Sequence, residues 1–298
     1  MADPTLLFCV GATKAGTSWL YRYLHDHPSC ELRAVKEAHY FDTFEAEPQE
    51  QQIAAFQQRL AEMRSAKADA QANDIGWKVK NMTRRIGEME GLIDVLGENR
   101  RDDLAYTAWL MKDAEDAALV ADMTPSYASL PDYRLNRMLR MSPTTKFVYL
   151  LRDPIDRLWS HARMQAKRFK QTDEDYAKKA NNILWRVVNK GAETHITERG
   201  DYPATVERLR KIVPPGRLLV QFMEDLFTPA GLAKMCDFLG IPHHPADAAR
   251  VHAGDDVAMR DDLRPLVAKF LQNQYDWVAT HVGPVPDHWQ NNLKRAQL

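Results

Sequence analysis

The chain has 298 residues, of which 45% are hydrophobic and 27% charged, and its formal net charge at pH 7 is −1. This hydrophobic content is enough for a large core and excludes a disordered chain. A net charge near zero excludes a global positive field that would attract nucleic acid or anionic membranes, so a bound anion must be held by local groups. The length fits one large α/β domain with insertions.

The chain has no sequence signature of a metal site, a disulfide framework or a membrane anchor. Cys9, Cys30 and Cys236 form no CxxC pair and no zinc spacing. The first residues lack the features of a signal peptide. No stretch approaches the roughly 18 apolar residues of a membrane span. We therefore expect a soluble cytoplasmic protein with no bound metal, no membrane span and no nucleic-acid partner.

The first thirty residues predict a strand, a glycine loop and a helix. The continuous apolar run 6–10 is typical of a buried strand. A loop over 11–16 follows, and residues 17–24 have apolar positions at helical spacing. Pro28 ends that helix.

The middle of the chain is rich in helical patterns. Residues 47–73 form an amphipathic pattern, and 86–113 predict two more helices. The stretch 45–115 is therefore the candidate for a helical insertion or lid. A short buried strand is expected at 119–121 and a helix at 131–140.

The second half alternates strands and helices. Residues 146–151 predict a strand, after which Asp153 is a good N-cap and Pro154 a good first helical residue. Further helices are expected near 173–190, 203–213, 229–239 and 262–277, and a strand at 217–222. Strands separated by helices predict an α/β fold with a P-loop-like central parallel sheet flanked by helices on both faces.

The loop over residues 11–18 is a candidate phosphate site. It nearly matches the Walker A pattern G-x4-G-K-[ST], but the lysine stands inside the loop at Lys14. Backbone N–H groups and the start of the helix favour an anion here. The candidate binding residues are Gly11, Ala12, Thr13, Lys14, Ala15, Gly16, Thr17 and Ser18. An ordinary glycine-containing turn is the alternative.

Residues 10–24 resemble the 5′-phosphosulfate loop of the sulfotransferase superfamily, whose donor is 3′-phosphoadenosine 5′-phosphosulfate (PAPS). This resemblance implies that Lys14 contacts the 5′-phosphate and the leaving oxygen of PAPS. It also implies that Thr17 and Ser18 donate hydrogen bonds to that phosphate.

A second phosphate site is predicted in residues 147–160. Arg152 ends a predicted strand, at the edge where α/β sheets bind ligands, and its planar fork suits a phosphate. On the residues alone, pairing of Arg152 with Asp153 or Asp156 is an equal alternative. The segment resembles the 3′-phosphate element of the same superfamily, which implies that Arg152 and Ser160 bind the 3′-phosphate.

Residues 35–42 resemble the K-E-x-H-[FY]-F segment of glycan O-sulfotransferases and bacterial relatives. The resemblance implies that Glu37 is the general base. His39 is the rival base because its reference pKa is closer to neutral. A structural pair of Glu37 with a lysine is the alternative.

Two further segments bear on the acceptor and the nucleotide. Residues 122–127 resemble the T-P-[SA]-Y segment that borders the acceptor, but Met123 stands where the heparan enzymes have a lysine. This departure argues against a heparan-like acceptor, and Lys36 or Lys78 is a candidate replacement. Residues 255–264 stand where the family has a loop over the nucleotide, with Arg260 as the candidate and a solvated helix start as the alternative.

The combined prediction is a single sulfotransferase domain over residues 1–298. It would transfer a sulfuryl group in line from PAPS to a hydroxyl or amine of a small-molecule or glycan-like acceptor, without a required metal. A P-loop ATP-dependent kinase and a non-catalytic nucleotide-binding protein are the alternatives. The sequence makes no prediction of the acceptor's identity or of the oligomeric state.

Overall fold

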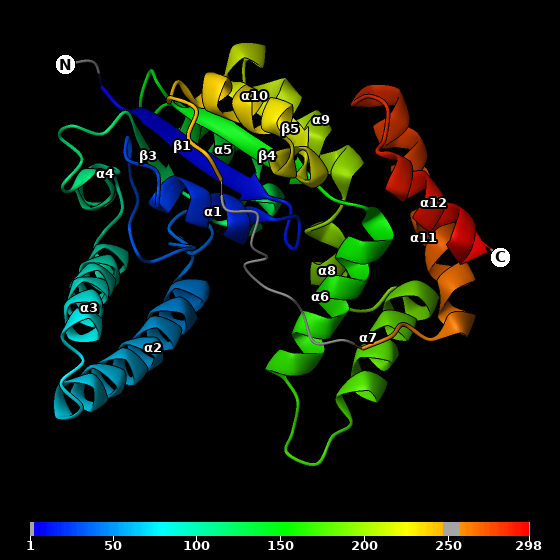
Figure 1. Ribbon diagram of the computed structural model, residues 1–298, viewed down its shortest axis with the longest axis horizontal. Coiled ribbons are helices and arrows are strands. Elements are labelled where there is room, and N and C mark those ends of the chain that lie inside the picture. Colours follow the sequence, from blue (N-terminus) through cyan, green and yellow to red (C-terminus); the bar gives the residue numbers. More distant parts are fainter. Residues whose placement is uncertain (1–2, 247–256, 298) are drawn as a thin grey trace.

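The computed structural model describes residues 3–246 and 257–297. Within that part, a parallel sheet has the strand order β2-β3-β1-β4-β5 (Figure 1). The strands are β1 (Thr5–Gly11), β2 (Cys30–Glu31), β3 (Leu119–Asp122), β4 (Lys146–Leu151) and β5 (Leu218–Phe222). The predicted fold class is confirmed.

The register of the sheet brings the two predicted phosphate elements to one edge. In β1, Leu6 is paired with Val120 of β3, and Phe8 is paired with Phe147 of β4. Parallel neighbours end at the same side of a sheet. The loop after β1 and the residues after β4 therefore lie next to each other.

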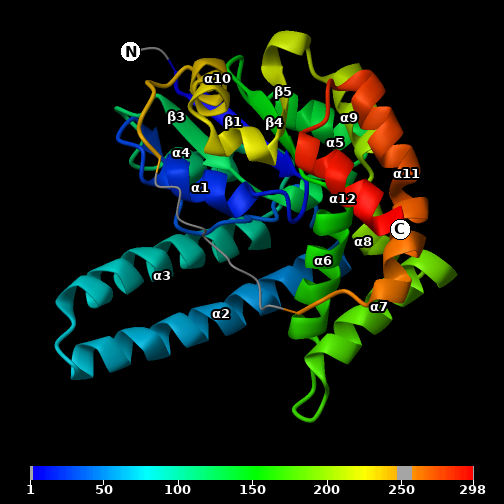
Figure 2. The ribbon, with the colours of Figure 1, turned by 45° about the vertical axis from the view of Figure 1, so that its right-hand side comes forward.

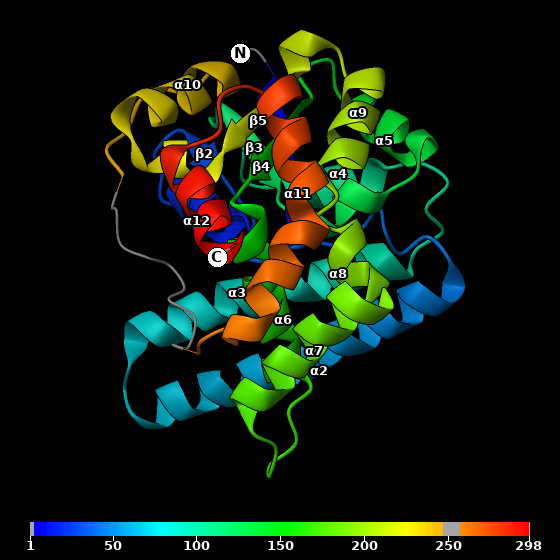
Figure 3. The ribbon, with the colours of Figure 1, turned by 90° about the vertical axis from the view of Figure 1, so that its right-hand side faces the viewer.

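Helices cover both faces of the sheet, and Figure 3 shows α10 on one side of the strands and α5 and α9 on the other. In chain order they are α1 (Thr17–His25), α2 (Ala46–Ala72), α3 (Gly76–Gly97), α4 (Leu104–Met111), α5 (Asp132–Leu139), α6 (Pro154–Arg168), α7 (Tyr176–Lys190), α8 (Thr194–Glu198), α9 (Tyr202–Ile212), α10 (Pro229–Leu239), α11 (Arg264–His281) and α12 (Asp287–Gln297). In the described part, no helix combines the length and apolar character needed to cross a bilayer.

Helices α2 and α3 form an antiparallel hairpin that projects from the sheet (Figure 2). Helix α3 begins at Gly76, before the predicted start at residue 86. Near the sheet, the Trp109 indole donates to the Glu88 carbonyl (3.0 Å), and Arg84 bridges Glu88 (2.8 Å) and Glu31 (2.9 Å). These contacts anchor the base of the hairpin, while its role as a lid stays a prediction.

The start of α10 provides a test of the packing. A Cβ at Gly231 would lie 2.2 Å from the Asp225 carbonyl oxygen, which is backbone and cannot rotate away. We predict that Gly231→Ala lowers the free energy of unfolding by about 1–3 kcal/mol, measured by chemical denaturation. Gly87→Ala is the matched control. Gly87 is exposed on α3, and an added Cβ would meet no neighbouring atom within 4 Å. It should stabilise the fold by about 0.5–1 kcal/mol. Equal effects of the two substitutions would contradict this packing.

Candidate active site

The candidate phosphate loop, residues 11–18, turns tightly from β1 into α1. Lys14 has a φ of 72° and Gly16 a φ of 85°, both in the left-handed region. A Cβ at Gly16 would lie 2.6 Å from the Met223 Cγ atom, so both conformation and space favour glycine here. The Gly16 carbonyl accepts from the amides of Trp19 (3.0 Å) and Leu20 (3.1 Å), so α1 starts directly at the loop. This arrangement places a helix N-terminus beside Lys14.

Positive charge is concentrated around Lys14. Partial burial is the main cause that lowers its pKa, and the charges of Arg152, Arg163 and Lys36 lower it further. The negative charge of Glu37 acts in the opposite direction. A bound polyanion would relieve the mutual repulsion among these cations. A nucleotide with two phosphate groups is such a polyanion.

Arg152 joins the two predicted phosphate elements. Its Nη1 atom donates to the Lys14 carbonyl (3.1 Å), and its Nη2 atom lies 4.0 Å from the Asp156 Oδ2 atom. The Tyr202 hydroxyl accepts from the Arg152 amide (3.1 Å) and donates to its carbonyl (2.6 Å), which holds the backbone in place. Ser160 follows on α6 and is half-buried. The structure thus brings Lys14 and Arg152 together, and Asp156 is the acid that pairs with Arg152.

Asp153 starts helix α6, as predicted. Its carboxylate accepts from the Asp156 amide (2.9 Å), the Tyr275 hydroxyl (2.8 Å) and the Asn292 amide (2.8 Å). Burial raises the pKa of Asp153 to about 6, and these hydrogen bonds limit the rise. Sequence reasoning found the N-cap but missed Tyr275 and Asn292, which lie more than 100 residues away in the chain.

Glu37 is held between two positive groups. Its Oε1 atom lies 2.5 Å from the Lys36 Nζ atom, and its Oε2 atom lies 3.9 Å from the His39 Nε2 atom. Burial alone would raise the pKa of Glu37, but the Lys36 ion pair, with smaller effects of His39 and Arg199, holds the pKa below its ordinary value. Glu37 is therefore ionised at neutral pH.

His39 is oriented by an acid that sequence reasoning assigned no role. The His39 Nδ1 atom lies 2.9 Å from the Asp42 Oδ2 atom, which also accepts from the Ser126 hydroxyl (2.5 Å). Burial would lower the pKa of His39, but the hydrogen bond and charge of Asp42 outweigh it and raise the pKa. The only sequence signal was an acid three residues after the histidine.

The segment that carries Glu37 is attached to the end of β3. The buried Asp122 carboxylate accepts from the hydroxyls of Tyr106 (2.6 Å), Thr124 (2.5 Å) and Tyr127 (2.9 Å). The Tyr127 oxygen in turn accepts from the Tyr40 amide (2.9 Å). The T-P-S-Y segment therefore holds the backbone next to Glu37, in addition to any contact with an acceptor.

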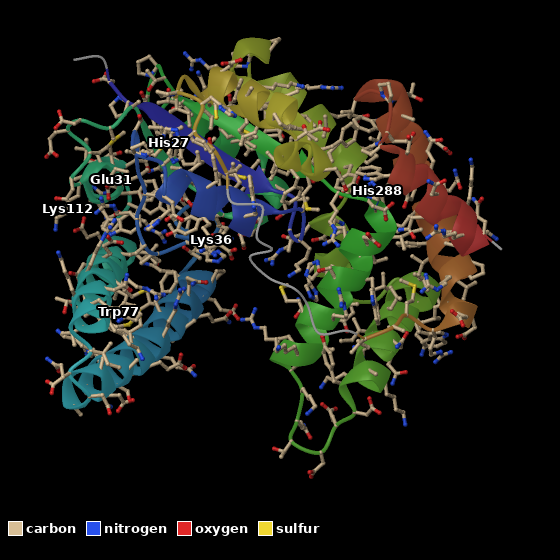
Figure 4. The ribbon with its side chains drawn as sticks, in the orientation of Figure 1. His27, Glu31, Lys36, Trp77, Lys112 and His288 are labelled. Atoms are coloured by element: carbon tan, nitrogen blue, oxygen red, sulfur yellow. The ribbon has the colours of Figure 1, made fainter. Side chains whose placement is uncertain are left out.

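Lys36 and Lys78 are the two candidates to replace the lysine that the heparan enzymes have at the position of Met123. Met123 itself is buried, and the two lysines lie in different parts of the structure. Lys36 contacts Glu37 directly, and Figure 4 shows it beside α1 on the sheet side of the hairpin. Helix α3 starts at the end of the hairpin that lies away from the sheet (Figure 2), and Lys78 is in its first turn. Of the two lysines, Lys36 is the one at the candidate site.

Arg260 is paired in this structure. Its Nε atom donates to Asp262 (2.9 Å), and its backbone amide donates to the Asn181 side chain (2.9 Å). It precedes a 3₁₀ turn, Asp261–Leu263, and its side chain is exposed. Residues 255 and 256 of the predicted loop lie outside the described residues. The role of Arg260 at the nucleotide stays a prediction.

A parallel sheet with a glycine loop after its central strand defines the P-loop-like class of α/β proteins. The profile described as "Sulfotransferase family" matches residues 4–245, and the chain belongs to this family. A comparison with curated proteins gives no match.

Comparison with solved structures gives three sulfotransferases to which this chain is similar to different degrees. The sulfotransferase from Alicyclobacillus acidocaldarius is 20% identical with a TM-score of 0.61, covering 97% of this chain and 100% of the other. The sulfotransferase domain from the curacin biosynthetic pathway is 17% identical with a TM-score of 0.48, covering 99% and 97%. The corresponding domain from the Synechococcus PCC 7002 olefin synthase is 19% identical with a TM-score of 0.46, covering 100% and 94%. At these identities, the first of the three supports the fold.

The Asp42–His39 pair predicts a pH dependence. Because the pKa of His39 is raised in the folded chain, its protonated form stabilises the fold. That contribution is complete below the ordinary histidine pKa of about 6.5 and is lost as the pH rises through the raised value. We predict that Asp42→Asn lowers the pKa of His39, measured by NMR titration of the imidazole, and removes this part of the pH dependence of unfolding.

Asp132→Asn is the control for this titration. Asp132 pairs with Lys211 on the surface of α5 and does not contact His39. Its substitution should leave the His39 titration unchanged. An unchanged His39 pKa in Asp42→Asn would show that the Asp42 carboxylate does not set the charge of His39.

Proposed function

We propose that this protein transfers a sulfuryl group from PAPS to a hydroxyl or amine of a small-molecule or glycan-like acceptor. The observation that carries the proposal is the hydrogen bond from Arg152 to the Lys14 carbonyl, which joins the two phosphate elements at one edge of the sheet. Family membership supports the sulfuryl transfer. The paired phosphate elements support a donor with phosphate at both the 5′ and 3′ positions.

In the proposed complex, each phosphate has its own set of donors. The loop amides, Thr17, Ser18 and the N-terminus of α1 bind the 5′-phosphate. Arg152 and Ser160 bind the 3′-phosphate, where the planar guanidinium forms charge-assisted hydrogen bonds.

The reaction is an in-line displacement at sulfur. An acceptor oxygen or nitrogen forms a bond to sulfur as the bond from sulfur to the 5′-phosphate oxygen breaks, and the bonding electrons leave with that oxygen. Lys14 and the loop amides stabilise the charge that develops there. The product nucleotide is 3′-phosphoadenosine 5′-phosphate (PAP). These groups supply the charge stabilisation, so the proposed mechanism requires no metal.

Glu37 is the proposed general base. The acceptor must lose its proton as the new bond forms, and the ionised carboxylate of Glu37 is able to take it. His39 is less suited because its raised pKa favours the imidazolium, which has no free lone pair. His39 and Lys36 instead orient Glu37 and hold its negative charge in place.

Removal of the Arg152 guanidinium should reduce recognition of the 3′-phosphate. We predict that Arg152→Ala raises the Kd for PAP by about 10–100-fold, the effect of losing charge-assisted hydrogen bonds. The Kd for adenosine 5′-monophosphate should change much less, as measured by calorimetry. Arg140→Ala, at the exposed end of α5, is the matched control. An equal rise in the Kd for PAP and for adenosine 5′-monophosphate would count against a role of Arg152 at the 3′-phosphate.

Substitutions at the reacting centre should reduce turnover more than donor binding. We predict that Lys14→Ala lowers kcat by about 10²–10³-fold and that Glu37→Gln lowers it by about 10²–10⁴-fold. His39→Gln should have a smaller effect. The measurement is PAP release from PAPS with a panel of phenols, glycosides and amines. A wild-type rate in Lys14→Ala would overturn this mechanism.

A further inference from the structure

The C-terminal helices return to the edge of the sheet that carries Arg152. Both α11 and α12 lie beyond residues 4–245, the part matched by the family profile. Helix α11 packs on α6, and α12 packs on α11 (Figure 3). Trp289 is fully buried and donates to Glu224 (3.0 Å), so α12 is firmly attached to the body of the protein.

One side chain of α12 contacts both acids that flank Arg152. The Asn292 Nδ2 atom lies 2.8 Å from the Asp153 Oδ1 atom and 3.2 Å from the Asp156 Oδ1 atom. An amide nitrogen carries two hydrogens, so it is able to donate to both carboxylates at once. From α11, the Tyr275 hydroxyl donates to the other oxygen of Asp153 (2.8 Å).

Both acids bear directly on Arg152. Asp153 is its neighbour in the chain, is buried and caps α6, which carries Ser160. The Asp156 Oδ2 atom lies 4.0 Å from the Arg152 Nη2 atom, longer than a hydrogen bond. Asn292 holds the other oxygen of Asp156 at this distance.

We propose that Asn292 and Tyr275 are positioning residues for the 3′-phosphate site. They hold Asp153 and Asp156 so that the Arg152 guanidinium stays available to phosphate. This inference rests on the proposed function, in which Arg152 binds the 3′-phosphate of PAPS. It makes the C-terminal helices a part of the donor site.

The effect follows from the charges involved. Without Asn292, the Asp156 carboxylate loses its neutral donor and moves toward the nearest cation, Arg152. A closer ion pair competes with phosphate for the same N–H groups. Loss of a donor to the buried Asp153 carboxylate also weakens the first turn of α6. Both changes act first at Arg152 and Ser160, the proposed 3′-phosphate residues. Among the described residues, the Asn292 side chain donates to Asp153 and Asp156 and makes no hydrogen bond to the loop over residues 11–18.

The test is nucleotide binding to the full chain by Asn292→Ala, with Asn291→Ala as the matched control. Asn291 is the neighbouring asparagine and is exposed. We predict that Asn292→Ala raises the Kd for PAP about 10-fold, equivalent to about 1.4 kcal/mol, while the Kd for adenosine 5′-monophosphate changes less than about twofold. Asn291→Ala should leave both constants unchanged. An unchanged PAP affinity in Asn292→Ala would overturn the inference.

A second variant separates positioning from a general loss of folding. Tyr275→Phe removes only the hydroxyl. Like Asn292→Ala, it should raise the Kd for PAP relative to the Kd for adenosine 5′-monophosphate. Equal weakening of both nucleotides would indicate a merely structural role and overturn the inference. In the Arg152→Ala background, Asn292→Ala should cause no further loss, because the group that it positions is gone.

Nucleotide binding by the wild-type protein separates a failure of the proposed function from a failure of the positioning role. A wild type that does not prefer PAP over adenosine 5′-monophosphate would overturn the proposed function, and this inference with it. A wild type that prefers PAP, together with Asn292→Ala and Tyr275→Phe variants that keep the full preference, would overturn only the positioning role.

Discussion

The hydrogen bond between the Arg152 guanidinium and the Lys14 carbonyl is the interaction on which the site depends. It connects the carboxyl ends of β1 and β4, the two strands that present the phosphate elements. Parallel pairing of these strands places their ends side by side, and the Lys14 carbonyl that accepts from Arg152 belongs to a residue with a left-handed backbone. Tyr202 holds the backbone of Arg152 from the other side. Contacts within the protein thus hold the residues of the proposed donor site in place.

The proposed acceptor side has a different charge pattern. Glu37 is negative among positive neighbours, whereas Lys14 is positive and the positive charges of Arg152, Arg163 and Lys36 act on it together with the negative charge of Glu37. The first arrangement keeps the carboxylate of the proposed general base ionised, and the second favours the polyanion of the proposed donor. Asp122 and Tyr127 hold the Glu37 segment at the end of β3. In the proposed site, Lys14 and Arg152 therefore bind the donor, and the Glu37 segment faces the acceptor.

Sequence patterns predicted the elements whose signals are local. Strand β4 and the Asp153-Pro154 helix start were correct because an apolar run, an N-cap and a first-turn proline are read from adjacent residues. Strand β2 is only two residues long, too short to give a sequence pattern. Helix α12 is mostly polar and buries only Trp289 and Ala296, so its sequence shows no clear apolar periodicity. The contacts of Asn292 and Tyr275 with Asp153 join residues far apart in the chain. No single-sequence pattern specifies such contacts, because they depend on how α11 and α12 pack.

In the proposed function, the two phosphate elements together select a 3′-phosphorylated nucleotide. The most direct measurement is the thermal stabilisation of the wild-type protein by PAP, compared with ATP, ADP and AMP, each with and without Mg²⁺. A ligand at 100 times its Kd adds about 2.7 kcal/mol of stability, which is readily seen as a rise in Tm. We expect the largest rise in Tm with PAP, independent of Mg²⁺. If ATP with Mg²⁺ gave the largest rise, selection of a 3′-phosphorylated nucleotide would be wrong and a kinase would be favoured.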